Sequence, residues 1–257
     1  MEGRIIQDHT QDPYLGLAID HSLLLHSSDN RVTLRLWSNP PSVVIGRGQS
    51  PGLEVDQNYC LENGIKICRR ISGGGAVYQD DGNLNISLVY PRKSLAKLQN
   101  LQEATRLLPY LLLQSLEHSG ISHLSIDEMN SIYLDGLKVS GAASYLSRDT
   151  VLSHSTLLLS ANLEKLEKSL LHPEGARRKS RYSPTGNMSV LDVEAWKPTL
   201  IDLLGKRFST RIVEDNLTTE EAQLAERLCN SVYAREDWII EGRITYDVIL
   251  ALKKGIV

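Results

Sequence analysis

Three consecutive glycines, Gly73–Gly75, interrupt a stretch that alternates like β-strand on both sides. Glycine has no Cβ, so the backbone N–H groups of such a run can approach a ligand closely. Arg69 and Arg70 stand directly before the glycines, and guanidinium groups match phosphate and carboxylate oxygens bidentately. No helical pattern follows, and the motif Gly-x-x-x-x-Gly-Lys-Ser/Thr is absent. The stretch therefore predicts either a ligand lying across a sheet or a tight turn with solvated charges.

Composition narrows the class of protein. The chain of 257 residues is long enough for one large domain or two small ones. A formal net charge of −3 gives no global electrostatic reason to bind nucleic acid or an anionic membrane. Cys60, Cys68 and Cys229 are odd in number and lack Cys-x-x-Cys spacing, so neither disulfides nor a structural zinc site is expected. We expect buried thiols and a soluble cytoplasmic protein, since no apolar leader or membrane-length stretch occurs.

Hydrophobic periodicity predicts an alternation of helices and strands. Pro109 is expected to kink or split a long helix, and the turn signals at Asp80–Asn83 and Asp135-Gly136 predict two hairpins. Thr218 and Glu221 resemble a capping box, with Trp238 marking the end of the helix that follows. Helices are predicted at 13–26, 55–63, 94–119, 162–171, 196–207 and 218–238, and strands at 32–37, 42–45, 65–71, 76–79, 84–90, 131–134, 137–140 and 150–160.

Several polar residues accompany the glycine run. Alternation places Asn83 and Asn85 back towards it, and it places Lys138 and Ser140 on one face of the second hairpin. The segment 172–189 is poor in apolar residues. It is predicted to be either a solvated surface loop or a lid whose cations close over a phosphate. Its basic residues are Arg177, Arg178, Lys179 and Arg181.

The stretch 69–85 resembles the signature Arg-Arg-x-Ser/Thr-Gly-Gly-Gly-Ala/Thr-Val-x-His-Asp-x-Gly-Asn/Asp-x-Asn of lipoate–protein ligases, within the biotin/lipoate ligase and octanoyltransferase superfamily. Further landmarks follow in the family's order, and the resemblance extends over roughly residues 1–240. It implies an α/β (α+β) fold, with a curved mixed β-sheet flanked by helices, as a single catalytic domain over 1–257. The landmarks are Leu17-Ala18-Ile19-Asp20, Val43-Val44-Ile45-Gly46-Arg47-x-Gln49, Asp135-Gly136-x-Lys138-Val139-Ser140-Gly141, His154-x-Thr156-Leu157-Leu158 and Leu217-Thr218-x-Glu220-Glu221.

The resemblance also implies a two-step reaction. Lipoate and ATP, with Mg²⁺, give lipoyl-AMP, and a lysine of a lipoyl domain of a 2-oxoacid dehydrogenase E2 or of the glycine-cleavage H protein then forms an amide. Lys138 matches the family's active-site lysine, which would stabilise developing negative charge. The segment 172–189 matches the family's mobile adenylate-binding loop. The expected pocket comprises Arg70, Ser72, Gly73, Gly74, Gly75, Ala76, Gln79, Asp80, Asn83, Asn85, Asn130, Ser140, Gly141, Ala142, His154 and Thr156, with no resident metal ligand.

The chain departs from the family pattern at two points. Gln79 stands where the family usually has histidine, so any help in deprotonating the attacking lysine would have to come from His154. The chain is also shorter than many bacterial ligases, and related short ligases need a separate accessory protein for adenylation. We expect the same here, in place of a C-terminal accessory domain.

Two other functions remain open at this level. One is transfer of a lipoyl or octanoyl group without ATP. A thiolate mechanism of the kind one branch uses is excluded, because no cysteine lies near His123, about fifteen residues before Lys138. The other is a scaffold that binds lipoyl domains without catalysis, which the retained Lys138, Arg70 and glycines oppose.

Overall fold

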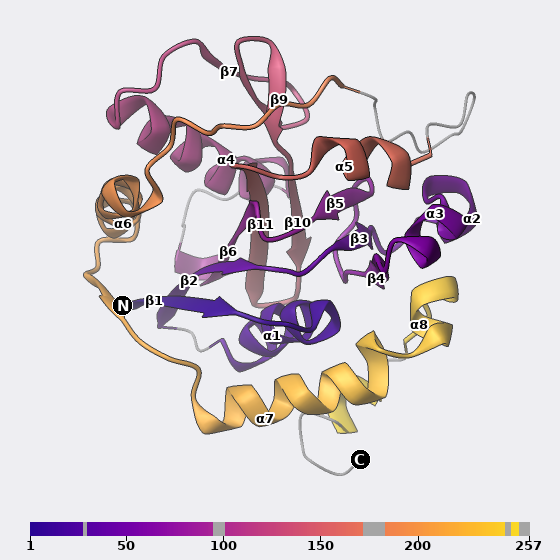
Figure 1. Ribbon diagram of the computed structural model, residues 1–257. Helices are drawn as coiled ribbons and strands as arrows, with labels where there is room; N and C mark the ends of the chain where they lie inside the picture. Colours follow the sequence, from indigo (N-terminus) through magenta and orange to yellow (C-terminus); the bar gives the residue numbers. More distant parts are fainter. Residues whose placement is uncertain (28–29, 95–100, 172–182, 245–247, 252–257) are drawn as a thin grey trace.

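The computed structural model describes the chain except for residues 28–29, 95–100, 172–182, 245–247 and 252–257. A six-stranded mixed sheet in the order β10-β11-β6-β2-β1-β12 forms its centre (Figure 1). β1 pairs in parallel with both β2 and β12, and the other neighbours are antiparallel. The strands are β1 (Glu2–His9), β2 (Arg31–Ser38), β6 (Asn83–Pro91), β10 (Ala142–Leu146), β11 (Thr150–Leu158) and β12 (Ile212–Glu214).

Two smaller sheets flank one end of the central sheet and carry most of the predicted site. The first has the order β4-β3-β5, and the second has the order β7-β8-β9. Their strands are β3 (Ser42–Ile45), β4 (Lys66–Arg69), β5 (Val77–Gln79), β7 (Leu124–Ile126), β8 (Ile132–Leu134) and β9 (Leu137–Ser140).

Helices cover both faces of the central sheet. α1 (Pro13–His26) and α7 (Thr219–Leu228) pack on one face, and α4 (Leu101–His118) and α6 (Val193–Phe208) pack on the other (Figure 1). Burial of each large apolar side chain in these two layers contributes roughly 1.5–3 kcal/mol. The shorter elements are α2 (Pro51–Glu54), α3 (Gln57–Glu62), a 3₁₀ turn (Arg92–Ser94), α5 (Leu163–Ser169), a π turn (Cys229–Tyr233) and α8 (Glu236–Glu241).

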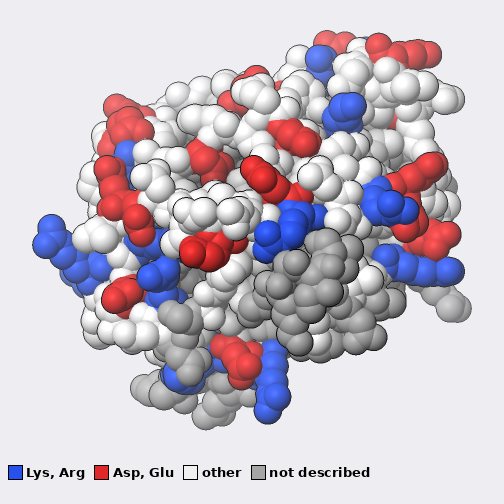
Figure 2. All heavy atoms as spheres, turned by 90° about the horizontal axis from the view of Figure 1, so that it is seen from below, with Lys and Arg blue, Asp and Glu red and all other residues white. Residues whose placement is uncertain are grey.

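This arrangement confirms the expected fold class, a mixed sheet flanked by helices. Helix 13–26 and strand 42–45 begin and end where the periodicity places them. The capping box is present, since Thr218 accepts from the backbone of Glu221 and Glu221 accepts from that of Thr218. Among the described residues, no helix combines the length and apolar character that a bilayer crossing requires. Acidic and basic side chains are interspersed over the face on which α7 lies (Figure 2).

The sequence predicts that Pro109 kinks or splits its helix, and the structure shows that it does not split α4. α4 runs without interruption from Leu101 to His118. A proline inside a helix costs about 3 kcal/mol, but the residues around it bury a continuous apolar stripe against the sheet. Ala104, Leu108, Leu111, Leu112 and Leu116 all belong to that core, and their burial outweighs the lost hydrogen bond.

The predicted hairpin over 76–90 is wrong. β5 pairs with β3, whereas β6 pairs with β2 and β11, so the turn between them links two different sheets. The turn is docked onto the connection between β11 and α5 instead. Leu159 and Ser160 both donate to the Gly82 carbonyl at 2.9 Å. A Cβ at Gly82 would lie 2.3 Å from the Ser160 backbone, so only glycine fits there.

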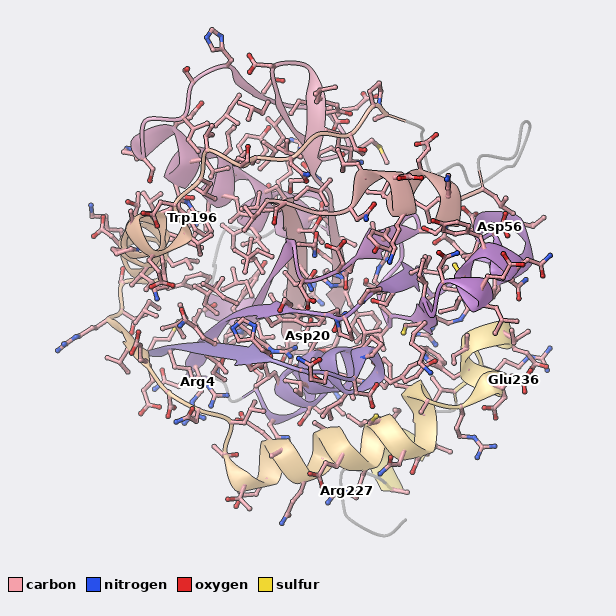
Figure 3. All side chains as sticks on the ribbon, in the orientation of Figure 1. Arg4, Asp20, Asp56, Trp196, Arg227 and Glu236 are labelled. Carbon is pink, nitrogen blue, oxygen red and sulfur yellow. The ribbon has the colours of Figure 1, made fainter. Side chains whose placement is uncertain are left out.

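β1 has no counterpart among the predicted strands, and Trp238 does not end the helix that begins at Thr218. β1 is buried over four successive residues and so lacks alternation. Arg4 in its middle is buried because it ion-pairs with Glu221 and donates to the Thr33 hydroxyl (Figure 3). Trp238 lies inside the separate helix α8, beyond the π turn that ends α7.

Candidate functional site

A cavity of about 650 Å³ opens between the glycine run, β11 and the β8–β9 hairpin. The structure brings most of the sequence-predicted residues to its wall. Ser72, Gly73, Asp80, Asn83, Asn130 and Ser140 do not line it, and the four basic loop residues at 177–181 lie outside the described part of the chain. The predicted residues that do line it are Arg70, Gly74, Gly75, Ala76, Gln79, Asn85, Lys138, Gly141, Ala142, His154 and Thr156.

The apolar part of the wall was not predicted as site. Leu17 from α1, Trp37 from β2 and Val44 from β3 contribute to it. Trp37 is held by a hydrogen bond of 3.0 Å from its indole to the Ser87 hydroxyl, which in turn donates to the buried Asp20 at 2.6 Å (Figure 3). In the sequence these residues carry only core-like periodicity, so no local signal separates them from packing residues.

Arg70 lies on the cavity wall, but its guanidinium is not an open anion fork. It donates to the carbonyls of Val44 at 3.0 Å and of Gly75 at 2.7 Å. It also donates to the Gly73 carbonyl at 2.7 Å and to the Ser72 hydroxyl at 3.1 Å. Burial lowers its pKa to about 10, so it stays protonated at neutral pH. Arg70 therefore shapes the glycine run and supplies a positive field.

Arg69 does not line the cavity, in keeping with the alternation that puts it on the opposite face of the strand from Arg70. Its guanidinium donates to carbonyls of two other segments, and the Trp238 indole donates back to the Arg69 carbonyl at 2.9 Å. A buried guanidinium with this many backbone partners is a structural clamp. The accepting carbonyls are those of Gly46, Arg47, Gln49, Trp238, Ile239 and Ile240.

The glycine run needs glycine at particular positions. Gly74 has φ of +91°, a backbone region that side-chain-bearing residues avoid. The neighbouring Gly46 packs so closely that a Cβ there would lie 2.2 Å from the Gly74 carbonyl oxygen. At Gly73 a Cβ would meet nothing within 4 Å. The run is therefore held in one shape by its surroundings at Gly74, whereas Gly73 has room for a side chain.

His154 does not have the properties of a base at neutral pH. Its Nε2 lies 2.6 Å from the Ser72 hydroxyl. Burial and the nearby Arg70 charge lower its pKa to about 3. A general base works best with a pKa near the operating pH. His154 is therefore too weak a base to supply the help that Gln79 lacks, and its hydrogen bond holds Ser72 beside the glycines.

Gln79 belongs to a buried cluster of amides at one end of the cavity. Its Oε1 accepts from Asn39 at 2.7 Å, and its Nε2 donates to Asn85 at 2.7 Å. Asn83 also donates to Asn85, at 2.9 Å. Asp80 lies outside the cavity and accepts from the backbone of Gly82 and Asn162. The amides orient one another, so the polar end of the cavity is fixed before a ligand arrives.

Lys138 projects from β9 into the same cavity. Its side chain is half-buried, and burial lowers its pKa while the charge of Asp127 acts in the opposite direction. Among the described residues, none lies within ion-pairing distance of its ammonium. Lys138 and Ser140 share a face as predicted, because both line an adjoining cavity of about 110 Å³. Leu137 is exposed and Val139 is buried.

The backbone of Lys138 is tied to the segment 183–186. Its N–H donates to the Pro184 carbonyl at 2.8 Å, and Gly186 donates to its carbonyl at 3.0 Å. Asn130 is the left-handed residue of the turn before β8, with φ of +64°. It therefore shapes the hairpin that carries Lys138.

The cysteines and the described acidic residues offer no further reactive centre. All three cysteines are buried, as expected for Cys68 and Cys229, and burial raises their pKa values. Within the described ranges, no group of three or more His, Cys, Asp or Glu side chains gathers as a metal site would require.

The sequence of the chain is similar to those of known proteins. A family profile described as the lipoyl protein ligase A/B catalytic domain matches residues 12–207. The chain is 29% identical to the lipoate-protein ligase LplJ of Bacillus subtilis, over 91% of this chain and 72% of that protein. It is 36% identical to the mitochondrial lipoyl amidotransferase LIPT1 of Homo sapiens, over 70% of this chain and 48% of that protein. Relatives from Schizosaccharomyces pombe and Aeropyrum pernix are matched over 57% of their own length.

Solved structures share the fold at similar identity. One is a bi-partite lipoate protein ligase of Thermoplasma acidophilum, described together with its E2 lipoyl domain. It has a TM-score of 0.84 and 26% identity, over 95% of this chain and 98% of that one. Another is a lipoate-protein ligase A bound with ATP, with a TM-score of 0.82 and 26% identity, over 95% of this chain and 100% of that one.

Proposed function

The chain belongs to the lipoyl protein ligase A/B family, and from that premise we propose that it is a lipoate–protein ligase. It activates lipoate with ATP to lipoyl-AMP and then transfers the lipoyl group to a lysine of a lipoyl domain or of the glycine-cleavage H protein. The observation that carries this proposal is the half-buried Lys138 in one cavity with the glycine backbone and the apolar wall.

The first step needs positive charge where a carboxylate oxygen attacks the α-phosphate. An O–P bond forms, the bond to the leaving pyrophosphate breaks, and negative charge builds on the phosphate oxygens. Of the two cations that line the cavity, Arg70 and Lys138, only Lys138 has no partner among the described residues. Its ammonium is therefore available to those oxygens. Arg70 contributes its fixed charge from behind the glycines. The apolar side chains of Leu17, Trp37 and Val44 suit an acyl chain.

The second step needs an amine that can attack the acyl carbonyl. A C–N bond forms, the bond to AMP breaks, and the amine loses a proton. Gln79 cannot accept that proton, and His154 is too weak a base. We therefore propose that the acceptor lysine enters already neutral or gives its proton to water or the leaving phosphate.

Transfer without ATP is the second candidate, and the human relative named as a lipoyl amidotransferase favours it. The two functions differ in one observable, because only the ligase releases pyrophosphate from ATP. The ATP-bound ligase structure, at 26% identity, supports the ligase. A non-catalytic scaffold is a third candidate, which would bind lipoyl domains equally well after Lys138→Ala.

Further components belong to the same proposal. Mg²⁺ would accompany the triphosphate, since this ion is bound mainly through phosphates with one or two carboxylates. A separate accessory subunit for adenylation is supported by the bi-partite ligase from Thermoplasma. We also propose that residues 1–257 act as one catalytic domain, in the cytoplasm.

The experiment is a reconstitution with purified chain, Mg-ATP, lipoate and a lipoyl domain. Pyrophosphate release and the mass of the lipoyl domain are measured with and without a candidate accessory protein. A ligase gives both products, with ATP consumed in step with lipoylation. Lipoylation from preformed lipoyl-AMP, with no pyrophosphate release from ATP even when the accessory protein is present, would instead assign a transferase. An equimolar mixture of lipoate and octanoate identifies the preferred acyl group from the product mass.

A further inference from the structure

Asp127 is fixed by its own turn on the wall of the main cavity. Its Oδ1 accepts from the backbone N–H groups of Met129 at 2.9 Å and Ser131 at 2.8 Å. Its Oδ2 accepts from the Tyr133 hydroxyl at 3.1 Å. The left-handed Asn130 closes the turn by donating to the Asp127 carbonyl at 3.0 Å. Three donors therefore hold this carboxylate in one place.

Tyr133 connects Asp127 to Lys138. In the β8–β9 hairpin, Tyr133 is the direct register partner of Lys138. Both side chains and Asp127 line the same cavity. The Tyr133 hydroxyl also lies 3.3 Å from the hydroxyl of Ser183, which belongs to the segment 183–186 that pairs with the Lys138 backbone. The carboxylate and the phenol thus share a hydrogen bond on the wall that Lys138 also lines.

Asp127 is the carboxylate that hydrogen bonds hold in place on the cavity that Lys138 lines. No described carboxylate lies within 4.0 Å of the ammonium, so Asp127 faces Lys138 from beyond contact distance. Burial lowers the Lys138 pKa and the Asp127 charge raises it. The other titratable groups facing it are exposed Glu128 on the same turn, Glu167 of α5 on the adjoining cavity, and Arg70 and His154 on the opposite wall.

We propose that Asp127, held back by Tyr133, is a positioning residue that keeps Lys138 charged yet unpaired for the proposed adenylation step. An ammonium taken out of water tends to lose its proton, and a carboxylate across the cavity opposes that loss. A direct ion pair would do the same but would occupy the ammonium. The three donors to Asp127 prevent that pair, so Lys138 remains available to an entering anion.

The inference makes opposite predictions for two conservative substitutions. Asp127→Asn removes the charge and keeps the shape, so the pKa of Lys138 falls. Tyr133→Phe removes one restraint on Asp127, so the carboxylate can move into contact with Lys138. The pKa of Lys138 then stays the same or rises, while adenylation slows because the ammonium is occupied. A role of Tyr133 in folding alone would not produce this combination.

The first arm measures Lys138 directly, without ATP or lipoate. Lysines of the full chain are dimethylated with ¹³C-formaldehyde, which keeps their charge, and Lys138→Arg identifies the Lys138 signal in NMR spectra. We expect Asp127→Asn to lower the midpoint by at least about half a pH unit and Tyr133→Phe not to lower it. Asp135→Asn at the exposed hairpin tip is the matched control and leaves it unchanged.

The second arm measures pyrophosphate release against pH in the same variants. Protonated Lys138 is the working form, so activity falls as the pH rises through its pKa. Asp127→Asn should move that fall to lower pH. An unchanged Lys138 midpoint in folded Asp127→Asn overturns the inference. A variant that slows only the transfer from preformed lipoyl-AMP overturns it too, because Asp127 would then act at the acceptor amine. This inference rests on the proposed function, but the first arm does not: shifted Lys138 midpoints with no adenylation, even with the accessory protein present, would refute the function and retain the effect of Asp127 on Lys138.

Discussion

The two walls of the cavity use their charged residues in opposite ways. On the glycine wall, Arg70 is almost fully buried and donates to backbone carbonyls, as does its chain neighbour Arg69 outside the cavity. On the hairpin wall, the Lys138 ammonium has no described partner and is only half-buried. A cation that holds the backbone gains many fixed hydrogen bonds, whereas one that serves a ligand must stay free. Position in the fold, not charge alone, decides which role a basic residue has.

Replacing Lys138 tests the comparison with the largest expected effect. Lys138→Ala should lower adenylate formation by at least about 10²-fold, because the freely available cation is lost where charge develops. Its folding should change little, since no described residue pairs with the ammonium. Pyrophosphate release and thermal unfolding measure the two effects. Near-normal release in the folded variant would contradict both the proposed function and the division between the walls.

Acid should lower the free energy of unfolding through two buried histidines, His154 on the glycine wall and His21 in α1. Burial lowers the pKa of His21 to about 4 and that of His154 to about 3, with Arg47 and Arg70 respectively adding to the shift. Both stay neutral in the folded chain, whereas the unfolded chain takes up protons near pH 6.5. The free energy of unfolding should therefore fall as the pH drops from 6.5 towards 4, by up to about 1.4 kcal/mol per pH unit for each histidine.

Urea titrations at a series of pH values measure this slope. His154→Gln keeps a hydrogen-bonding group beside Ser72 but cannot titrate, so its slope should be about half that of the parent. An identical slope in both proteins would show that His154 does not stay neutral on the glycine wall.

Arg70→Lys tests whether the glycine wall needs the guanidinium shape rather than its charge. The ammonium has three donors and cannot reach the carbonyls of Val44, Gly73 and Gly75 together. We expect a loss of about 1–3 kcal/mol in the free energy of unfolding, read from denaturant midpoints. The reference is Lys66→Arg on the exposed start of β4, which should change stability by no more than about 0.5 kcal/mol. Equal stability of Arg70→Lys and the parent would make Arg70 a ligand-type residue like Lys138.

Gln79→His is expected to have the smallest effect. A neutral imidazole has one donor and one acceptor, enough to replace the contacts to Asn39 and Asn85. Transfer from preformed lipoyl-AMP to a lipoyl domain should change by less than about threefold, because general-base help would require a pKa near 7 that burial opposes. An acceleration of tenfold or more would show that this end of the cavity lacks a base.

The sequence predicted the location of the cavity better than the way its residues act. The glycine run, Lys138 and the hairpin that carries it follow from local pattern, because turns and alternation are set by neighbouring residues. Three of the carbonyls that accept from Arg69 lie about 170 positions further along the chain, and no periodicity in the sequence predicts them. The same limit explains the false hairpin over 76–90, since docking of Gly82 against Ser160 overrides a valid turn signal. Asp127 was not predicted as a site residue, because only the folded structure puts its carboxylate on the same cavity as Tyr133 and Lys138.

The clamp from Arg69 to α8 has a consequence for synthesis on the ribosome. The carbonyls of Trp238, Ile239 and Ile240 become available to Arg69 only after nearly the entire described chain has emerged. β1 likewise pairs along its second edge only after β12 has been synthesised. We therefore expect the contact between Arg69 and α8 to form only at a late stage of translation. Its first 200 residues would depend on protection from premature association.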